Sequence, residues 1–305
     1  MRLLITGASG LLGINLALEA GARYEVFAVD RRKLARTPFR ILNADLLDPG
    51  AVDRVLDQAR PDWVIHCAAL ANLEDCEANP SLAEQMNARL PGRVAAACRD
   101  RGLPLVHIST DAVFDGTQEG PYVEEDPPRP VSVYARTKLE GERGVLSAWP
   151  DAIVARVNFF GWSPSGKRSL GEFFYNNLSA GRYVSGFADV TFCPMFVGDL
   201  AEVLLKMLEK RLHGLYHAVG PQAMSKYQFG VEIARKFGLD PLHITPKSVH
   251  TSPLVAPRSH NLRLSTHKLS TALGEPLPGF STGLDRFYQQ LQHGYPQKIR
   301  SYQQA

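Results

Sequence analysis

The sequence predicts an α/β fold, built on a doubly wound parallel sheet, with a smaller C-terminal α/β domain. Short and nearly continuous apolar segments recur through the first half of the chain, as expected for parallel strands that are covered on both faces. Segments with helical spacing of apolar residues separate them, and this rhythm predicts right-handed crossovers. A glycine-rich turn follows the first apolar segment directly, which indicates a Rossmann-type arrangement.

The expected elements follow in order along the chain. Buried strands are predicted over residues 3–6, 25–29, 63–67, 105–109 and 153–157, with a minor strand over 40–42. Helices are predicted over residues 11–20, 51–60, 81–101 and 133–149. After residue 160 the pattern is less regular: we expect a loop over 161–168, helices over 170–180 and 226–237, an apolar helix after Asp199, and a proline-containing loop over 245–257 that covers a cleft.

Composition excludes several classes of protein. Of the 305 residues, 45% are hydrophobic, and 34 Lys and Arg against 31 Asp and Glu give a net charge of +3. This hydrophobic content and small net charge do not fit a disordered chain. The small charge excess also gives no sign of a concentrated nucleic-acid-binding surface. The sequence contains no uninterrupted apolar stretch of about 18 residues, so it predicts no membrane span. The N-terminus enters a strand without a signal-peptide core, so we expect a cytoplasmic protein without membrane partners. The four cysteines are dispersed, and we expect no metal.

The turn Thr-Gly-Ala-Ser-Gly-Leu-Leu-Gly over residues 6–13 predicts a dinucleotide site. Gly7 permits the tight turn, Gly10 lets the backbone approach a pyrophosphate, and Gly13 lets the helix pack closely on the strand. The N-terminus of the following helix offers free N–H groups to phosphate. The sequence therefore predicts an NAD(P)-binding Rossmann domain over residues 1–160, to which 187–210 return. A substrate-binding domain is expected over 161–305.

The choice between NAD(H) and NADP(H) stays open at this point. Asp30 ends the second strand, where its carboxylate can accept hydrogen bonds from the ribose hydroxyls, which favours NAD. Arg31, Arg32 and Lys33 follow immediately, and a guanidinium at this position can pair with a 2′-phosphate. Asp45, after the short third strand, is placed to bind the adenine amino group.

Three polar residues form a candidate catalytic group. Tyr134 and Lys138 share one face of a predicted helix. A free tyrosine has a pKa of about 10, and a nearby ammonium is expected to lower it. Such a pair can give a proton to a carbonyl oxygen as hydride arrives at carbon. Thr110, at the end of a predicted strand, offers a hydroxyl to the same oxygen. His66 and His107 lie within predicted strands and are expected to be satisfied core histidines.

Together these motifs resemble the extended short-chain dehydrogenase/reductase superfamily. More narrowly, the chain resembles the dTDP-4-dehydrorhamnose reductase (RmlD-like) family in the stretches 61–69, 109–116 and 134–142, and again at Ala256-Pro257-Arg258. The resemblance covers essentially the whole chain. The resemblance implies an NAD(P)H-dependent oxidoreductase that reduces a nucleotide-activated 4-keto-deoxysugar, as in dTDP-rhamnose and polysaccharide biosynthesis. Thr110, Tyr134 and Lys138 would be the catalytic residues, with Tyr134 as proton donor.

The resemblance, together with the glycine turn, also assigns binding residues. We expect the cofactor to contact Gly7, Ser9, Gly10, Leu11, Leu12, Gly13, Asp30, Arg31, Asp45, Leu46, Ala69, Leu70, Ala71, Tyr134 and Lys138. We expect the nucleotide sugar to contact Thr110, Asp111, Phe159 and Arg258. The helix that holds Tyr134 commonly forms a dimer face in resembling proteins, which implies a possible homodimer.

Departures from the family pattern leave the sugar open. The family usually has an aromatic residue at the position of Ala112 and a tryptophan at that of Phe159, and both border the sugar pocket in relatives. The related dehydratases place a glutamate where Ala112 stands, so dehydration is disfavoured. Two alternatives to a reductase remain: a non-catalytic regulatory subunit like that of methionine adenosyltransferase, and a sugar-nucleotide epimerase.

Overall fold

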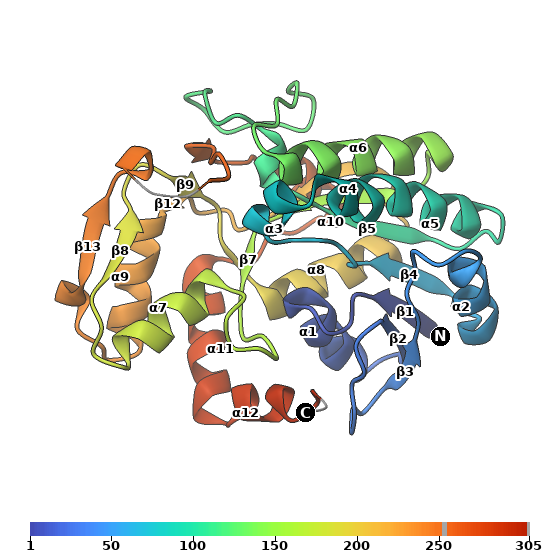
Figure 1. Ribbon diagram of the computed structural model, residues 1–305, viewed down its shortest axis with the longest axis horizontal. Coiled ribbons are helices and arrows are strands. Elements are labelled where there is room, and N and C mark those ends of the chain that lie inside the picture. Colours follow the sequence, from blue (N-terminus) through green and yellow to red (C-terminus); the bar gives the residue numbers. More distant parts are fainter. Residues whose placement is uncertain (252–254, 304–305) are drawn as a thin grey trace.

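The computed structural model describes residues 1–251 and 255–303. Its centre is a seven-stranded parallel sheet in the order β11-β6-β5-β4-β1-β2-β3 (Figure 1). The strands are β1 (Arg2–Thr6), β2 (Glu25–Asp30), β3 (Arg40–Asn43), β4 (Trp63–His66), β5 (Leu105–Thr110), β6 (Ile153–Val157) and β11 (Gly214–Ala218). The predicted doubly wound sheet is confirmed, and each predicted strand agrees to within one residue at either end.

The strand β11 was not expected from the sequence. It pairs in parallel with β6, with Gly214 opposite Ile153, and so forms one edge of the central sheet. Its segment is short and follows the part of the chain where the apolar pattern loses its regularity. The edge strand of the sheet therefore comes from a region far along the chain from β6. No local sequence pattern near β6 indicates that this strand is its neighbour.

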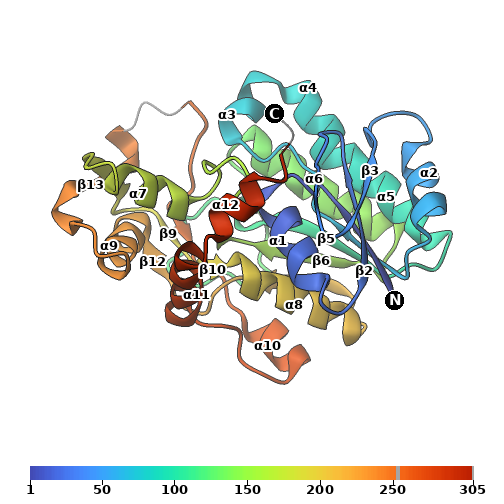
Figure 2. The same cartoon turned by 90° about the horizontal axis from the view of Figure 1, so that it is seen from below.

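Helices cover both faces of the sheet. In β1, Leu3 and Ile5 pack in one apolar cluster with α1 (Leu11–Ala20) and α8 (Val197–Glu209), whereas Leu4 packs in the other with α2 (Ala51–Ala59) and α5 (Leu90–Arg99). This alternation follows from the period of two along a strand. Figure 2 shows α1 and α8 together on the near face. On the opposite face, α6 (Val133–Ala148) packs against α5.

The helix predicted over residues 81–101 is confirmed as a continuous helical stretch over 80–99, but it is not a uniform α-helix. After α3 (Leu73–Ala78), the chain forms α4 (Pro80–Ala83), a π-helical segment Glu84–Arg89 and then α5 without a break. Pro91 lacks the N–H that would donate to the Asn87 carbonyl in an α-helix. On the other side Gly141 of α6 packs so closely that a Cβ there would lie 2.1 Å from the Asn87 oxygen. Both features favour a local π-bulge at Asn87.

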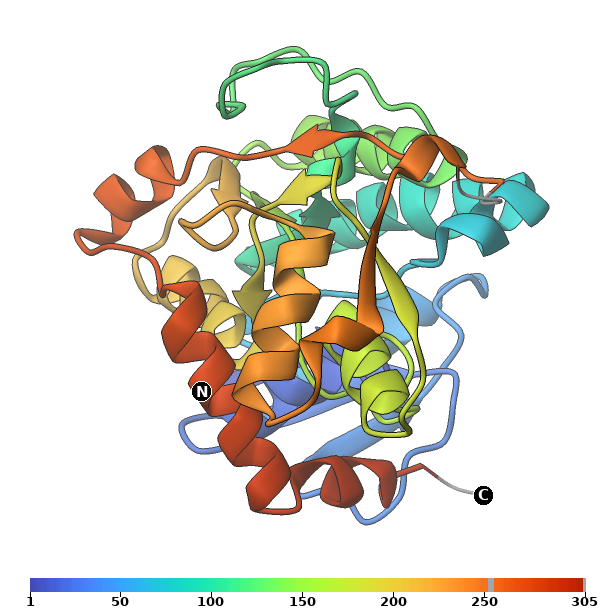
Figure 3. The same cartoon turned by 90° about the vertical axis from the view of Figure 1, so that its left-hand side faces the viewer.

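The second part of the molecule lies at the carboxyl end of the sheet. Here α7 (Leu170–Leu178) packs on α9 (Lys226–Lys236), beside a parallel pair formed by β8 (Val184–Phe187) and β13 (Ile244–Lys247) (Figure 3). The loop predicted over 245–257 is thus wrong at its start, because β13 and a 3-10 turn (Val249–Thr251) occupy it. Pro246 is tolerated because β13 pairs on one side only. Residues 252–254 of that prediction lie outside the described residues.

Short strands and C-terminal helices connect the two parts. The short strands are β7 (Phe159–Phe160) with β10 (Met195–Phe196), and β9 (Thr191–Phe192) between β12 (Met224–Ser225) and β14 (Asn261–Leu262). The helices are α10 (His267–Leu273), α11 (Phe280–Gln292) and α12 (Tyr295–Arg300). Phe160 contacts the rings of Phe229, Phe280 and Phe287, so one aromatic cluster joins both parts. Across the described residues, no helix has the length and apolar character to cross a membrane.

Candidate active site

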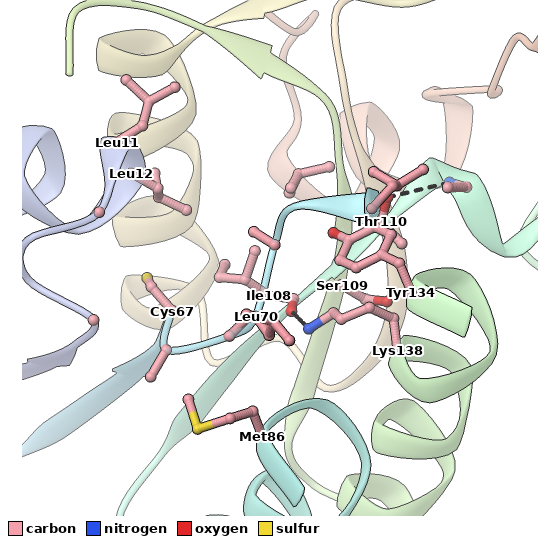
Figure 4. Close-up of a pocket in the computed structure, with 18 of the residues that line it drawn as sticks. Leu11, Leu12, Cys67, Leu70, Met86, Ile108, Ser109, Thr110, Tyr134 and Lys138 are labelled. Carbon is pink, nitrogen blue, oxygen red and sulfur yellow. Dashed lines mark hydrogen bonds between the residues drawn. The ribbon is translucent and has the colours of Figure 1, made fainter. Parts of the chain in front are cut away.

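A cleft of about 480 Å³ opens at the carboxyl ends of the sheet strands (Figure 4). This is the edge where open α/β sheets bind ligands, and the volume is that of a typical small-molecule site. Every residue that the sequence analysis assigned to catalysis, cofactor or substrate lines it, from Gly7 in the first turn to Arg258 near the C-terminus. The fold therefore brings the predicted residues together, while their individual roles stay predictions.

The glycine turn is sterically suited to a dinucleotide. Gly7 has φ +72°, and a Cβ there would lie 2.8 Å from the backbone of Ala68. A Cβ on Gly13 would lie 2.2 Å from the Gly7 oxygen, so the helix packs on the turn only because both residues lack side chains. Gly10 is the N-cap of α1 and provides no side-chain cap. The first N–H groups of α1 therefore face the cleft as ready donors to phosphate.

Asp30 ties the end of β2 to this turn. Its Oδ2 accepts a hydrogen bond from the Ser9 N–H (2.8 Å), and its Oδ1 accepts one from the Arg32 N–H (2.9 Å). The sequence analysis expected Asp30 to accept from ribose hydroxyls. The structure places it in the cleft as expected, but each carboxylate oxygen already has one backbone donor, so Asp30 also has a structural role.

Tyr134 and Lys138 project from α6 into the cleft beside Thr110 (Figure 4). Burial raises the pKa of Tyr134, a hydrogen bond with Thr110 opposes the rise, and the negative charge of Asp111 adds to it. The expectation that the Lys138 ammonium lowers this pKa is wrong in the structure. The ammonium instead donates a 2.6 Å hydrogen bond to the Ile108 carbonyl at the end of β5.

Lys138 is buried, and its side chain lies beside the core histidine of β5. It is 2% exposed, and burial lowers its pKa to about 8, although the charge of Glu142 opposes the shift. The His107 Nε2 lies 3.5 Å from its Nζ, and the rings of His66 and His107 stack at 5.5 Å. His66 and His107 are buried as predicted, but His66 Nε2 and His107 Nδ1 lack partners among the described residues, so they are not fully satisfied.

A buried carboxylate lies next to Thr110. Asp111 is 3% exposed and accepts hydrogen bonds from Asn158 Nδ2 (2.5 Å) and Thr110 Oγ1 (3.1 Å). Burial raises its pKa to about 6, and these hydrogen bonds and the charge of Lys226 reduce the rise. Sequence reasoning missed Asn158 and Lys226, which both line the cleft. Their signal was positional: Asn158 directly follows β6, and Lys226 is the first residue of α9.

Asn87 is a second residue that the sequence analysis missed. It is fully buried in the π-helical segment, where its Oδ1 accepts from the Leu70 N–H (2.9 Å) and its Nδ2 donates to the Leu70 carbonyl (3.0 Å). Leu70 belongs to the stretch after β4 that lines the cleft. The amide of Asn87 thus holds the backbone of a predicted cofactor-binding residue, and the π-bulge turns it toward that backbone.

Arg258, a predicted substrate residue, lines the far end of the cleft. Its Nη2 lies 2.9 Å from Glu74 Oε1 in α3, and the other oxygen of Glu74 accepts from the Ala256 N–H (3.2 Å). This ion pair links the C-terminal segment to α3 across the cleft. Phe159 is partly buried in β7 and also lines the cleft, so both positions are compatible with contact to a sugar nucleotide.

A group of possible metal ligands lies outside the cleft lining. Atoms of Asp189, His250 and His260 lie within 4.8 Å of one another, although the sequence analysis expected no metal. The carboxylate of Asp189 already accepts hydrogen bonds from Ser248 Oγ (2.5 Å) and the Val249 N–H (3.0 Å). The three residues come from distant segments, so no spacing motif pointed to them. Since hydrogen bonding accounts for this geometry, we assign the group no metal chemistry.

Comparison with known proteins places this architecture in one family. The family model of the RmlD substrate binding domain matches residues 1–293. The chain belongs to this family. The match runs through both parts of the molecule, so the RmlD-family assignment includes the glycine turn, the Tyr134 helix and the segment that carries Arg258.

The relatives of this RmlD-family chain include a reductase and a subunit of a different enzyme. The dTDP-4-dehydrorhamnose reductase of Mycobacterium tuberculosis is 34% identical over 304 residues, which cover 93% of this chain and 96% of the relative. Methionine adenosyltransferase 2 subunit beta of Mus musculus is 33% identical over 296 residues, which cover 93% and 86%. A crystal structure of dTDP-4-dehydrorhamnose reductase from Bacillus anthracis in complex with NADP has a TM-score of 0.85 and 27% identity, covering 95% of this chain and 99% of that one.

Proposed function

We propose that this protein is an NAD(P)H-dependent reductase of a nucleotide-activated 4-keto-deoxysugar, similar to dTDP-4-dehydrorhamnose reductase. The observation that carries the proposal is the convergence of Thr110, Tyr134 and Lys138 with the glycine turn in one cleft. The Mycobacterium tuberculosis relative and the NADP complex of the Bacillus anthracis enzyme support the same class of reaction.

Different residues of the cleft would bind the cofactor and the sugar nucleotide. The backbone of the glycine turn and the N-terminus of α1 would take the pyrophosphate, and the stretch at Ala69, Leu70 and Ala71 would flank the cofactor. Lys138 would hold the nicotinamide ribose, as the family resemblance implies. Asp111, Phe159 and Arg258 would contact the sugar nucleotide at the other end of the cleft. When bound, NAD(P)H supplies the hydride that reduces the keto carbon.

Tyr134 then supplies the proton. As negative charge develops on the sugar oxygen, the phenol donates its proton to that oxygen, and the keto group becomes an alcohol. Burial raises the pKa of Tyr134, so the phenol stays protonated at neutral pH and is in the form that reduction needs. Thr110 orients the same oxygen with its hydroxyl. Ala112, the neighbour of Asp111, has no acid or base to offer, so elimination of water is not expected here.

We also propose that residues 1–160 with 187–210 form the cofactor-binding domain, and that the rest of 161–305 forms the substrate-binding domain. Two observations support this division: α8 packs on α1 under the sheet, while α7, α9 and β8 lie at its carboxyl end. The strand β11 is an exception within 161–305: because it completes the seven-stranded sheet, we assign it to the cofactor-binding domain.

The test is a turnover screen of nucleotide-4-ketosugars with NADH and NADPH in parallel, followed at the absorbance of the reduced nicotinamide. We expect consumption of the reduced cofactor with one ketosugar, and a loss of about 10²–10⁴-fold in kcat for Tyr134→Phe. Tyr183→Phe is the matched control, since Tyr183 is 74% exposed and lies outside the cleft. An unchanged rate in Tyr134→Phe would contradict the mechanism.

The same screen separates the two alternatives. A regulatory subunit, as the name of the murine relative suggests for that protein, would bind cofactor, turn over no ketosugar and form a stoichiometric complex with a partner enzyme. An epimerase would copurify with cofactor that is regenerated in every cycle, so no net consumption of NADH or NADPH would accompany sugar conversion.

A further inference from the structure

The segment that follows α11 folds back onto the loop that leaves β2. This α12 segment (residues 295–303) contains α12 and the turn after it, and Figures 1 and 3 show α12 beside the loop between β2 and β3. The Ala35 N–H donates a 2.8 Å hydrogen bond to the Tyr302 carbonyl. Next to it, Leu34 and Gln303 form an antiparallel bridge. Two backbone contacts therefore attach the α12 segment to this loop.

Buried side chains give the α12 segment a defined position. Leu34, Ile299 and Tyr302 are buried and belong to the main apolar cluster of the molecule. At the start of α12, the Tyr295 hydroxyl donates a 2.8 Å hydrogen bond to Asn15 Oδ1 in α1, and Asn15 is itself buried. The segment is thus held by the core at both of its ends, so its contact with the loop after β2 comes from the fold.

The loop that the α12 segment holds carries residues of the cleft. Arg31 and Arg32 line the cleft and lie just before Leu34. On the side of β2 the loop is fixed by Asn43, whose Nδ2 donates to the Asp30 and Arg31 carbonyls (3.1 Å each). On the other side it is fixed by the backbone contacts with the α12 segment. Arg31 and Arg32 therefore lie between two fixed points, one of which comes from a segment about 270 residues further along the chain.

The backbone of this loop has a conformation that needs support. Arg36, directly after Ala35, has φ +57°, which lies in the left-handed region that residues other than glycine rarely adopt. Such a conformation persists where the surrounding structure holds it in place. The hydrogen bond from Ala35 to the Tyr302 carbonyl is made at the neighbouring residue. Loss of the docked α12 segment should therefore let the loop relax and move Arg31 and Arg32.

We propose that the α12 segment positions the adenosine end of the cleft, with Tyr302 as the positioning residue, and that its docking raises the affinity for the adenosine half of the dinucleotide. The proposal rests on the proposed function for the identity of the cofactor. NAD(H) and NADP(H) share this half, so the proposal is independent of the choice between them. The segment lies beyond residues 1–293, which the family model matches, so the family assignment does not include it.

The first test is equilibrium binding of NADPH and NADH, followed by their fluorescence, with adenosine 5′-monophosphate as competitor. Tyr302→Ala removes the buried ring that docks the segment, and Ala35→Pro removes the N–H that donates to the Tyr302 carbonyl. We expect each variant to weaken the binding of all three nucleotides by about fivefold or more. Tyr216→Ala is the matched control and should leave the three affinities unchanged. Tyr216 is 8% exposed, against 6% for Tyr302, and lies in β11 outside the cleft lining.

The second test is hydrogen exchange of the parent protein, which needs no substitution. If docking of the α12 segment favours binding, binding must favour docking by the same factor, because such coupling is reciprocal. We therefore expect adenosine 5′-monophosphate to slow exchange at the amides of residues 295–303 and at the Ala35 amide. A segment that only covers the core would exchange at the same rate with and without the nucleotide.

The outcomes separate this proposal from the proposed function. Normal affinities in both Tyr302→Ala and Ala35→Pro, an equal loss in Tyr216→Ala, or unchanged exchange at residues 295–303 would each overturn the role of the α12 segment. These three results leave the proposed reductase intact. If both variants weaken nucleotide binding and no ketosugar is turned over, the role of the α12 segment stands and only the proposed reaction fails.

Discussion

Glu142 and Arg156 form a buried ion pair next to Ser109, a residue that lines the candidate active site. Arg156 Nη2 lies 2.8 Å from Glu142 Oε2, and the two side chains are 2% and 4% exposed. Arg156 Nε also donates to Glu142 Oε1 (3.0 Å), which accepts a further bond from Ser109 Oγ (2.5 Å). Glu142 lies one helical turn after Lys138 in α6, and Arg156 lies in β6. The pair therefore fastens the helix that carries Tyr134 to the sheet.

The first prediction concerns the stability that this pair provides. Arg156→Met leaves the Glu142 carboxylate buried without its partner, so the free energy of unfolding should fall by about 3–5 kcal/mol. The double variant Glu142→Leu with Arg156→Met removes both charges and should recover much of that loss. Urea denaturation of the single and double variants measures the effect. A double variant that loses the sum of the two single effects would contradict it.

The second prediction concerns Asn87 and the stretch at Leu70. Asn87→Leu removes both hydrogen bonds to the Leu70 backbone, and each buried group left unpaired costs about 1–3 kcal/mol. We expect a lower melting temperature together with about tenfold weaker cofactor binding, because Leu70 lines the cleft. Leu146→Ala, a partly buried apolar change on α6 away from the cleft, is the control for general destabilisation. If both variants bind cofactor with normal affinity, the amide of Asn87 is not a positioning group.

The third prediction follows from the buried carboxyl of Asp111. Its pKa in the folded protein is raised to about 6, above the ordinary value of 3.8, so the folded state holds the proton more tightly than the unfolded state. The charged form therefore costs stability above pH 6, and that cost disappears as the pH falls toward 4. Asp111→Asn should raise the melting temperature at pH 7–8, with a gain that shrinks on acidification.

Asp111→Asn should also reduce turnover, since the side chain lies beside Thr110 in the cleft. Melting curves from pH 4 to 8 and steady-state rates on the same preparations check both halves of the prediction. A gain in melting temperature that does not vary with pH would show that repacking, and not titration of the carboxyl, is responsible.

The fourth prediction concerns Lys138. Its pKa is lowered to about 8, so the ammonium becomes neutral at a pH where an exposed lysine stays charged. We expect kcat/KM to fall as the pH rises through about 8, because Lys138 loses the charge with which it would hold the nicotinamide ribose. Lys138→Arg keeps its charge and should have no alkaline limb in this range, at a lower maximal rate. Rates from pH 6 to 10 measure the limb, and an identical limb in Lys138→Arg would assign it to another group.

For stability the sign at Lys138 is the opposite of that for a paired lysine. The folded-state pKa is depressed by burial, so between about 8 and 10.5 the unfolded state binds more protons than the folded one. The free energy of unfolding should therefore rise with pH over this window for the parent protein and rise less for Lys138→Met. Chemical denaturation at pH 8 and pH 10 makes this comparison.

Much of the site could be predicted because its requirements are local. The turn at Gly7 needs a positive φ and a close approach to Ala68, which only glycine supplies, so the residue type itself carries the information. The four-residue spacing of Tyr134 and Lys138 places both on one face of α6 wherever that helix packs. The alternation of apolar strands and helices likewise depends on short-range periodicity, and six of the seven strands of the central sheet, β1 to β6, lie where the sequence predicted them.

The remaining features were decided by the tertiary structure alone. They depend on contacts between segments that lie far apart in the sequence, with no motif or regular spacing that connects them. The sequence by itself determined the strands, the glycine cradle and the chemical groups of the cleft. Three features come only from the packed molecule: the hydrogen bond of the Lys138 ammonium with the Ile108 carbonyl, the π-helical turn at Asn87 against Gly141, and the place of β11 in the sheet. Distances of this kind follow from how elements pack against one another, and packing sums small contributions from the whole chain.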